Sequence, residues 1–142
     1  MNRKLANETL NRPSIDEFKK QNKFPLKVLL NDIRSMANVG SIFRTADSFN
    51  VEELLLCGIT AKPPHRDIQK TALGATESVV WRYSENAEET VKLLKLDGYR
   101  ILSLEQCEIS TDPRNLKLSP EEKICLVLGN EVEGVHQRII DL

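Results

Sequence analysis

The chain has 142 residues, of which 40% are apolar and 29% are charged, a balance typical of one soluble globular domain. It has no apolar run near the roughly 20 residues of a membrane span and no apolar segment of a secretory signal at its start, so we expect a cytoplasmic protein that does not enter a membrane. The net charge of −1 gives no overall attraction to nucleic acid, so an RNA contact requires a local basic surface.

The cysteines and histidines do not predict a disulfide or a metal site. Cys57, Cys107 and Cys125 are odd in number and have no C-x-x-C spacing, so we expect reduced thiols that pack as small apolar side chains. His65 and His136 lie in polar surroundings, and we expect both at the surface. Without a cluster of Cys and His residues, we expect no metal.

Residues 1–24 form a polar N-terminal extension, in which Ser14 is positioned to cap a short helix that runs to Lys20. From residue 25 on, short apolar runs alternate with segments that repeat apolar residues at helical spacing. We predict strands at Leu26–Leu30, Glu53–Cys57, Ser78–Tyr83, Tyr99–Leu104 and Ile124–Leu128. We predict helices at Val39–Phe49, at Asn86–Leu96 and from Val135 to Leu142, with polar loops at 60–77 and 105–123.

This alternation predicts an α/β fold with a mostly parallel sheet flanked by helices. Ligands of such sheets bind beyond the carboxyl ends of the strands. Three polar clusters follow predicted strand ends, namely Asn31–Arg44, Glu105–Gln106 and Gly129–Gly134. We therefore expect the three clusters to meet in one site.

The first cluster places Asn38 just before the predicted helix, and Gly40 is expected to open that helix tightly. A helix start offers free N–H groups and a partial positive charge, and Arg44 follows one turn after Gly40. A simpler interpretation is an ordinary asparagine cap followed by a surface arginine. In the last cluster, a strand breaks at Gly129 and delivers Glu131 into a glycine-bounded turn, for which a turn with solvated acids is the simpler interpretation.

The only phosphate-facing surface that the sequence offers comes from Lys62, His65, Arg66 and Lys70, which fall within nine residues, with Arg34 and Arg44 as additions. A solvated charged loop is the alternative. No G-x-G-x-x-G and no G-x-x-x-x-G-K-[ST] pattern is present, which disfavours dinucleotide and triphosphate sites.

The motifs in this order resemble those of the SpoU–TrmH RNA methyltransferases. NVGSIFRTADSF, from Asn38 to Phe49, is similar to the first motif of that family, and LVLGNEVEGV, from Leu126 to Val135, is similar to the second. KTALGATESVVW resembles the connecting segment and ILSLEQ the strand before the second motif, so the resemblance spans Leu26–Leu142.

The resemblance implies an S-adenosylmethionine-dependent transfer of methyl to a ribose 2′-hydroxyl of tRNA or rRNA, by a homodimer whose α/β fold is closed by a deep trefoil knot. The resemblance implies that Arg44 takes part in activating this hydroxyl. Because a guanidinium stays charged at neutral pH and is a poor base, we expect Arg44 to stabilise charge on the ribose oxygen or to bind an adjacent phosphate. Asn38 would orient Arg44 or the ribose, and Glu131 would fix Arg44 or the motif loop. The implied cofactor-binding residues are Leu104, Glu105, Gly129 and Asn130, and the RNA-binding candidates remain Arg34, Lys62, Arg66 and Lys70.

The third motif of the family, an Ile-Pro segment followed by Ser-Leu-Asn, would come after Leu142 and is absent. We therefore interpret residues 25–142 as a C-terminally incomplete methyltransferase domain and favour a fragment of a longer enzyme. A non-catalytic RNA-binding module on the same fold is the alternative, which the missing motif favours and the two intact motifs disfavour. A flavodoxin-like signalling or nucleotide-binding domain is a further alternative. It would need acidic metal ligands or a phosphate-binding glycine loop at the first strand, and the sequence shows neither.

Overall fold

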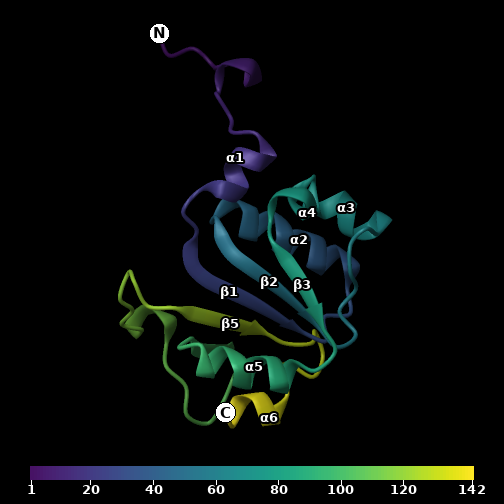
Figure 1. Ribbon diagram of the computed structural model, residues 1–142, viewed down its shortest axis with the longest axis vertical. Helices are drawn as coiled ribbons and strands as arrows, with labels where there is room; N and C mark the ends of the chain where they lie inside the picture. The colour runs from purple at the N-terminus through teal and green to yellow at the C-terminus, as the bar shows by residue number, and fades with distance from the viewer.

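The computed structural model describes residues 1–142 and contains one five-stranded sheet in the order β3-β2-β1-β5-β4 (Figure 1). All four strand pairs are parallel, so the predicted α/β fold with a mostly parallel sheet is confirmed. The strands are β1 (Phe24–Asn31), β2 (Val51–Cys57), β3 (Trp81–Ser84), β4 (Arg100–Leu104) and β5 (Ile124–Leu128).

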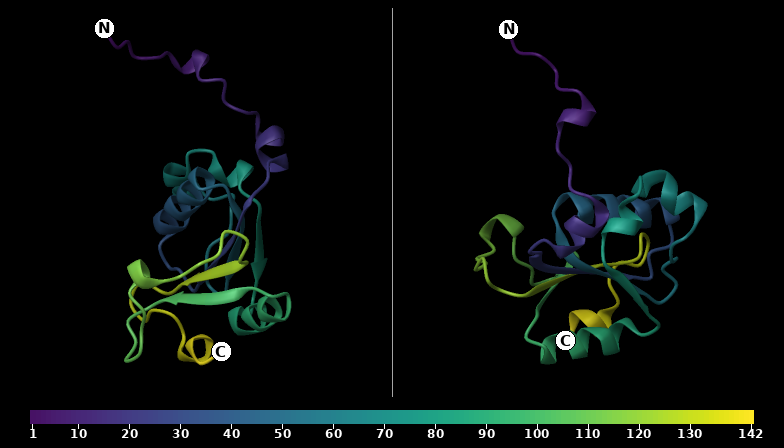
Figure 2. Two further views of the ribbon diagram at one scale, coloured as in Figure 1. Left: turned by 90° about the vertical axis from the view of Figure 1, so that its left-hand side faces the viewer. Right: turned by 45° about the horizontal axis from the view of Figure 1, so that its top comes forward.

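Helices cover both faces of the sheet and make a three-layer sandwich (Figures 1 and 2). Side chains of a strand point alternately to its two faces, so Val28 and Leu30 of β1 pack in one core cluster and Leu29 packs in the other. The first cluster is covered by α2 (Met36–Ser48), α3 (Arg66–Ala72) and α4 (Ala75–Ser78), and the second by α5 (Ala87–Leu96) and α6 (Gln137–Ile140).

The predicted loop at 60–77 is wrong, because α3 and α4 lie within it. Ile68 and Ala72 are four residues apart and both are fully buried, so the apolar stripe of α3 consists of two residues. So short a stripe did not predict a helix in a polar segment where Pro63-Pro64 indicates a loop. The same helices delay the third strand, which begins at Trp81 instead of Ser78.

The predicted start of the second helix is also wrong. Helix α2 begins at Met36, and Ser35 caps it by accepting a hydrogen bond from the Asn38 N–H at 3.2 Å, so Asn38 lies in the first turn. Gly40 therefore does not open the helix. A Cβ at Gly40 would lie 2.1 Å from Thr71 Oγ1 and 2.2 Å from the Ile68 carbonyl oxygen, so glycine there lets α3 pack closely against α2.

The N-terminal extension contains the predicted capped helix as α1 (Ile15–Lys20), in which the side chains of Ser14 and Glu17 cap each other's backbone. Helix α1 lies beside α4, and residues 1–14, with one short 3-10 helix at Asn7–Thr9, project away from the body (Figures 1 and 2). A second 3-10 helix at Pro113–Asn115 interrupts the loop between β4 and β5.

Cys57 and Cys125 are buried in the sheet, as expected of small apolar side chains. Burial raises the pKa of Cys57 to about 11 and that of Cys125 to about 12, so both thiols stay protonated. None of the helices has the length and apolarity of a membrane-spanning helix. No group of three or more His, Cys, Asp or Glu side chains is arranged to hold a metal ion.

Candidate active site

The turn that follows β5 is fastened to the end of β1. Asn130 and Gly134 exchange backbone hydrogen bonds of 3.0 and 2.9 Å, which close the turn. The Asn130 side chain accepts hydrogen bonds from the N–H groups of Val132 and Glu133 and donates one of 2.8 Å to the carbonyl oxygen of Asp32. The two sequence motifs therefore meet at one edge of the sheet, as predicted.

Glu131 makes the closest link between the motifs. Its Oε2 accepts a hydrogen bond from the Arg34 N–H, and its Oε1 accepts bonds from the Ser35 N–H and the Asn38 Nδ2, each at 2.9 Å. The carboxylate thus occupies the N-terminus of α2, where the helix dipole favours a negative charge. Burial alone would raise the pKa of Glu131, but the hydrogen bonds from the Arg34 and Ser35 backbone and from Asn38 outweigh it and hold the pKa at about 2.

Arg44 stands apart from this link. It is exposed on α2, and its guanidinium forms no ion pair or hydrogen bond with another side chain. Six residues separate it from Asn38, which turns it about 120° around the helix axis. Of the two expectations for Glu131, the structure shows contact with the motif loop and not with Arg44. Asn38 likewise bonds to Glu131 and not to Arg44.

All four cofactor-binding candidates line one hollow of about 330 Å³ at the carboxyl ends of β4 and β5. The side chain of Leu104 is 60% exposed on its wall. The hollow is lined by Leu104, Glu105, Gly129, Asn130, Glu131, Val132, Glu133 and Gly134.

Glu105 has a role that the sequence did not indicate. Its Oε1 accepts a hydrogen bond from the Gln106 N–H and its Oε2 accepts one from the Val135 N–H, both at 2.8 Å, and these bonds lower the pKa of the carboxyl. The side chain therefore holds the far end of the β5 turn. Gly134 has a φ of +70°, and a Cβ there would lie 1.9 Å from Glu105 Oε2, so only glycine fits this approach.

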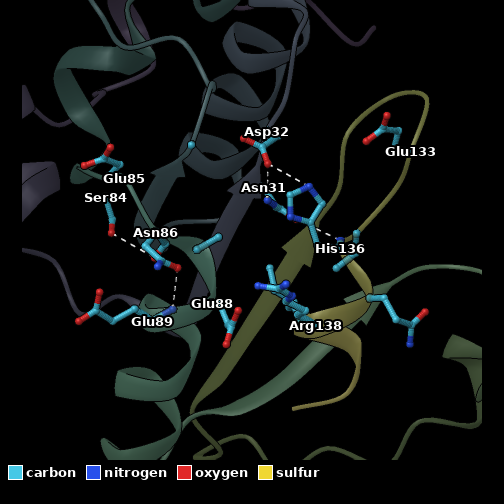
Figure 3. A pocket seen from close by; sticks show the side chains of 15 residues that line it. Asn31, Asp32, Ser84, Glu85, Asn86, Glu88, Glu89, Glu133, His136 and Arg138 are labelled. Atoms are coloured by element: carbon cyan, nitrogen blue, oxygen red, sulfur yellow. Dashed lines mark hydrogen bonds and ion pairs between the residues drawn. The ribbon is translucent and has the colours of Figure 1, made fainter.

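A larger cleft of about 1060 Å³ lies between the N-terminal end of α5 and the start of α6 (Figure 3). On its α6 side, Asp32 Oδ2 lies 3.1 Å from His136 Nε2 and accepts a hydrogen bond of 2.9 Å from Asn31 Nδ2. Asn31, which is 1% exposed, also accepts a hydrogen bond from the His136 N–H. His136 is exposed, as the sequence suggested, and it is also paired with Asp32. His65 caps α3 by accepting a hydrogen bond from the Asp67 N–H.

The four RNA-binding candidates do not form one free basic cluster. Lys70 pairs with Asp67 at 2.9 Å, and Lys62 Nζ lies 4.2 Å from the centre of the Tyr83 ring. Arg34 and Arg66 are exposed and have no ion pair. Arg34 lines a hollow of about 330 Å³ together with the exposed Ile59 and Val132, at the same edge of the sheet as Glu131.

A sequence model of the SpoU rRNA Methylase family matches residues 25–142. The chain belongs to this family. It is 32% identical over 121 residues to an uncharacterized tRNA/rRNA methyltransferase of Borreliella burgdorferi, a match that covers 85% of this chain and 51% of the relative. It is 26% identical over 125 residues to the mitochondrial rRNA methyltransferase 1 of Dictyostelium discoideum, covering 84% of this chain and 23% of the relative.

Solved structures of SpoU and TrmH proteins share the fold of this SpoU family chain. The TrmH/SpoU tRNA modifying enzyme of A. aeolicus superimposes with a TM-score of 0.77 at 21% identity, over 90% of this chain and 64% of that one. An AdoMet-bound rRNA methyltransferase of Sinorhizobium meliloti gives a TM-score of 0.76 at 21% identity, over 87% of this chain and 47% of that one. The chain thus spans about half the length of several of the proteins that it matches.

Proposed function

We propose that this chain carries the catalytic core of an S-adenosylmethionine-dependent methyltransferase that modifies a ribose 2′-hydroxyl of tRNA or rRNA. The observation that carries the proposal is the Glu131 carboxylate, which joins the two motifs at the carboxyl edge of the sheet. Membership in the SpoU family and the tRNA/rRNA methyltransferase names of its relatives support the same reaction class.

The residues of the hollow beside Leu104 fit one end of S-adenosylmethionine. The exposed Leu104 side chain offers an apolar wall to the adenine ring, and Gly129 and Gly134 keep the neighbouring backbone free of side chains. The volume of about 330 Å³ is at the lower end of the range for small-molecule sites. When bound, the cofactor supplies a methyl group activated by its sulfonium. We assign Leu104, Glu105, Gly129 and Asn130 to binding the cofactor. The Glu105 side chain contributes by fixing the turn after β5 through its hydrogen bond with Val135.

Arg44 is the proposed catalytic residue. Its guanidinium is exposed and unpaired, so it is available to a ribose oxygen that gains negative charge as its proton leaves, or to the adjacent phosphate. Asn38 and Glu131 are proposed as positioning residues, because they fix the first turn of the helix that carries Arg44. Arg34, Lys62, Arg66 and Lys70 are proposed to contact RNA phosphates, and a homodimer is proposed to complete the site.

The test is transfer of a deuterated methyl group from S-adenosylmethionine to tRNA and rRNA, followed by digestion to nucleosides and mass spectrometry. Labelled 2′-O-methylnucleosides are expected. Label on a base contradicts the ribose assignment. Calorimetric titration with S-adenosylmethionine separates the alternative, since a non-catalytic RNA-binding module would bind RNA without binding the cofactor. Light scattering measures the mass of the assembly in solution, and we expect the mass of a dimer.

A further inference from the structure

Positive charge is concentrated in the first 24 residues of the chain. They contain six Lys or Arg residues and three Asp or Glu residues, which gives a net charge of +3. Because the whole chain carries −1, the remaining 118 residues carry −4. The extension and the body therefore have opposite net charges, which the overall value conceals.

Residues 1–14, the N-terminal arm, hold their cations away from every acidic group of the body. The hydrogen bonds of residues 1–13 are all among Ala6, Asn7, Thr9 and Leu10. Arg3, Lys4 and Arg12 are exposed and form no ion pair. Figures 1 and 2 show the arm projecting from the body in each view. An arm without internal ion pairs presents its full charge to a partner.

The cations of the body are used differently. Lys27, Lys70 and Arg82 pair with acids, as do Lys92, Arg100 and Arg114. Six of the fourteen Lys and Arg side chains of the body are therefore paired, whereas Arg3, Lys4 and Arg12 of the arm are all free. A basic arm on a near-neutral or acidic domain is a common design for nucleic-acid contact.

The place of the arm connects it with the RNA-binding candidates. Helix α1, at its base, lies beside α4, which directly follows the α3 helix that carries Arg66 and Lys70. Helices α3 and α4 cover the same face of the sheet (Figure 1). A polyanion lying over α3 and α4 would continue towards α1 and the arm.

We propose that the N-terminal arm is an RNA-binding element, in which Arg3, Lys4 and Arg12 contact backbone phosphates beyond the active-site edge. The proposal rests on RNA being the substrate. The exposed side chains of Leu5 and Leu10 give the arm apolar surface to cover sugar or base faces once phosphates hold it. Binding orders the arm on the RNA and adds a salt-dependent, sequence-independent contribution to affinity.

The test compares the parent chain with the triple variant Arg3→Ala, Lys4→Ala, Arg12→Ala in binding to labelled unfractionated tRNA and to a 20-nucleotide poly(U), across a range of salt concentrations. Loss of three phosphate contacts makes the slope of log affinity against log salt shallower by about 2. At 150 mM salt the affinity is expected to fall by roughly 10- to 100-fold. Thermal unfolding should be unchanged, because Arg3, Lys4 and Arg12 form no hydrogen bond or ion pair with the body.

A matched control removes the same charge from the other side of the molecule, by Lys92→Ala, Lys95→Ala and Lys117→Ala on α5 and the loop before β5. This control should keep the parent affinity within about twofold, because α5 covers the opposite face of the sheet from α3 and α4 and Lys92 is already paired with Glu88. Equal losses of RNA affinity in the two triple variants overturn the arm as an RNA contact. So does an arm variant whose slope of log affinity against log salt equals that of the parent chain. A drop in oligomeric mass with unchanged RNA binding assigns the arm to a second copy of the chain instead. A parent chain that binds neither RNA overturns the proposed function and the arm together.

Discussion

Replacing Glu131 by Gln tests the link between the two motifs. The change keeps the size of the side chain and removes its charge, so three hydrogen bonds to the start of α2 lose their ionic partner. A pKa of about 2 against the ordinary 4.5 corresponds to roughly 3 kcal/mol of stabilisation of the folded state. Because the side chain is exposed, screening reduces this to about 1–2 kcal/mol. In a domain of this size we expect the melting temperature to fall by about 3–8 °C.

The stabilisation by Glu131 has a definite pH dependence. Its pKa is lower in the folded than in the unfolded chain, so the contribution is complete above pH 4.5 and is lost as the pH falls towards 2. By pH 3 roughly 40% of the difference between parent and variant remains. Urea unfolding at pH 7, 5 and 3 measures it.

Glu133→Gln is the matched control for this prediction, because Glu133 lies in the same turn and its carboxylate accepts no hydrogen bond. We expect its free energy of unfolding to stay within about 0.5 kcal/mol of the parent. Equal losses in the two variants, or a Glu131→Gln loss that is the same at pH 7 and pH 3, would refute the reasoning.

Three further substitutions test two close backbone approaches and the proposed catalytic role of Arg44. Gly134→Ala combines a strained positive φ with a clash against Glu105, and we expect it to lower the free energy of unfolding in urea by more than about 2 kcal/mol. Gly98→Ala is the control, because Gly98 has a φ of +84° but no atom within 4 Å of the added Cβ, and it should cost only about 1 kcal/mol. Equal costs in the two variants would contradict the clash. Gly40→Ala forces α3 away from α2, and we expect a loss of about 1–3 kcal/mol in the same assay, which an unchanged midpoint would exclude. Arg44→Ala should lower methyl transfer at least about 100-fold while calorimetry finds S-adenosylmethionine affinity within about twofold, and retained turnover removes Arg44 from catalysis.

The sequence predicted the sheet well because buried strands such as Ile124–Leu128 are uninterrupted apolar runs that end at Gly or Asn. It predicted less well where short helices are stabilised by distant neighbours. Helix α3 shows only Ile68 and Ala72 as its apolar face, and its position depends on the glycine that α2 presents to it.

The site was predicted as a meeting of segments, but not contact by contact. The order of the motifs places Asn38 and Glu131 at one edge, yet their hydrogen bond joins residues 93 positions apart and has no local signature. The same holds for Glu105, whose carboxylate bonds to Val135, and for the pairing of His136 with Asp32. Side-chain partners of this kind follow from tertiary packing, which a pattern of residue types does not encode.

The position of Glu131 so late in the chain also sets an order of events during translation. Its partner Arg34 leaves the ribosome 97 residues earlier, a delay of roughly 5–20 s at ordinary elongation rates. Over that interval the N–H groups of Arg34 and Ser35 lack their Glu131 acceptor, and β4 has no neighbour, since β5 is the only strand that pairs with it. A nascent chain therefore cannot complete this edge of the sheet until β5 and the turn after it have emerged.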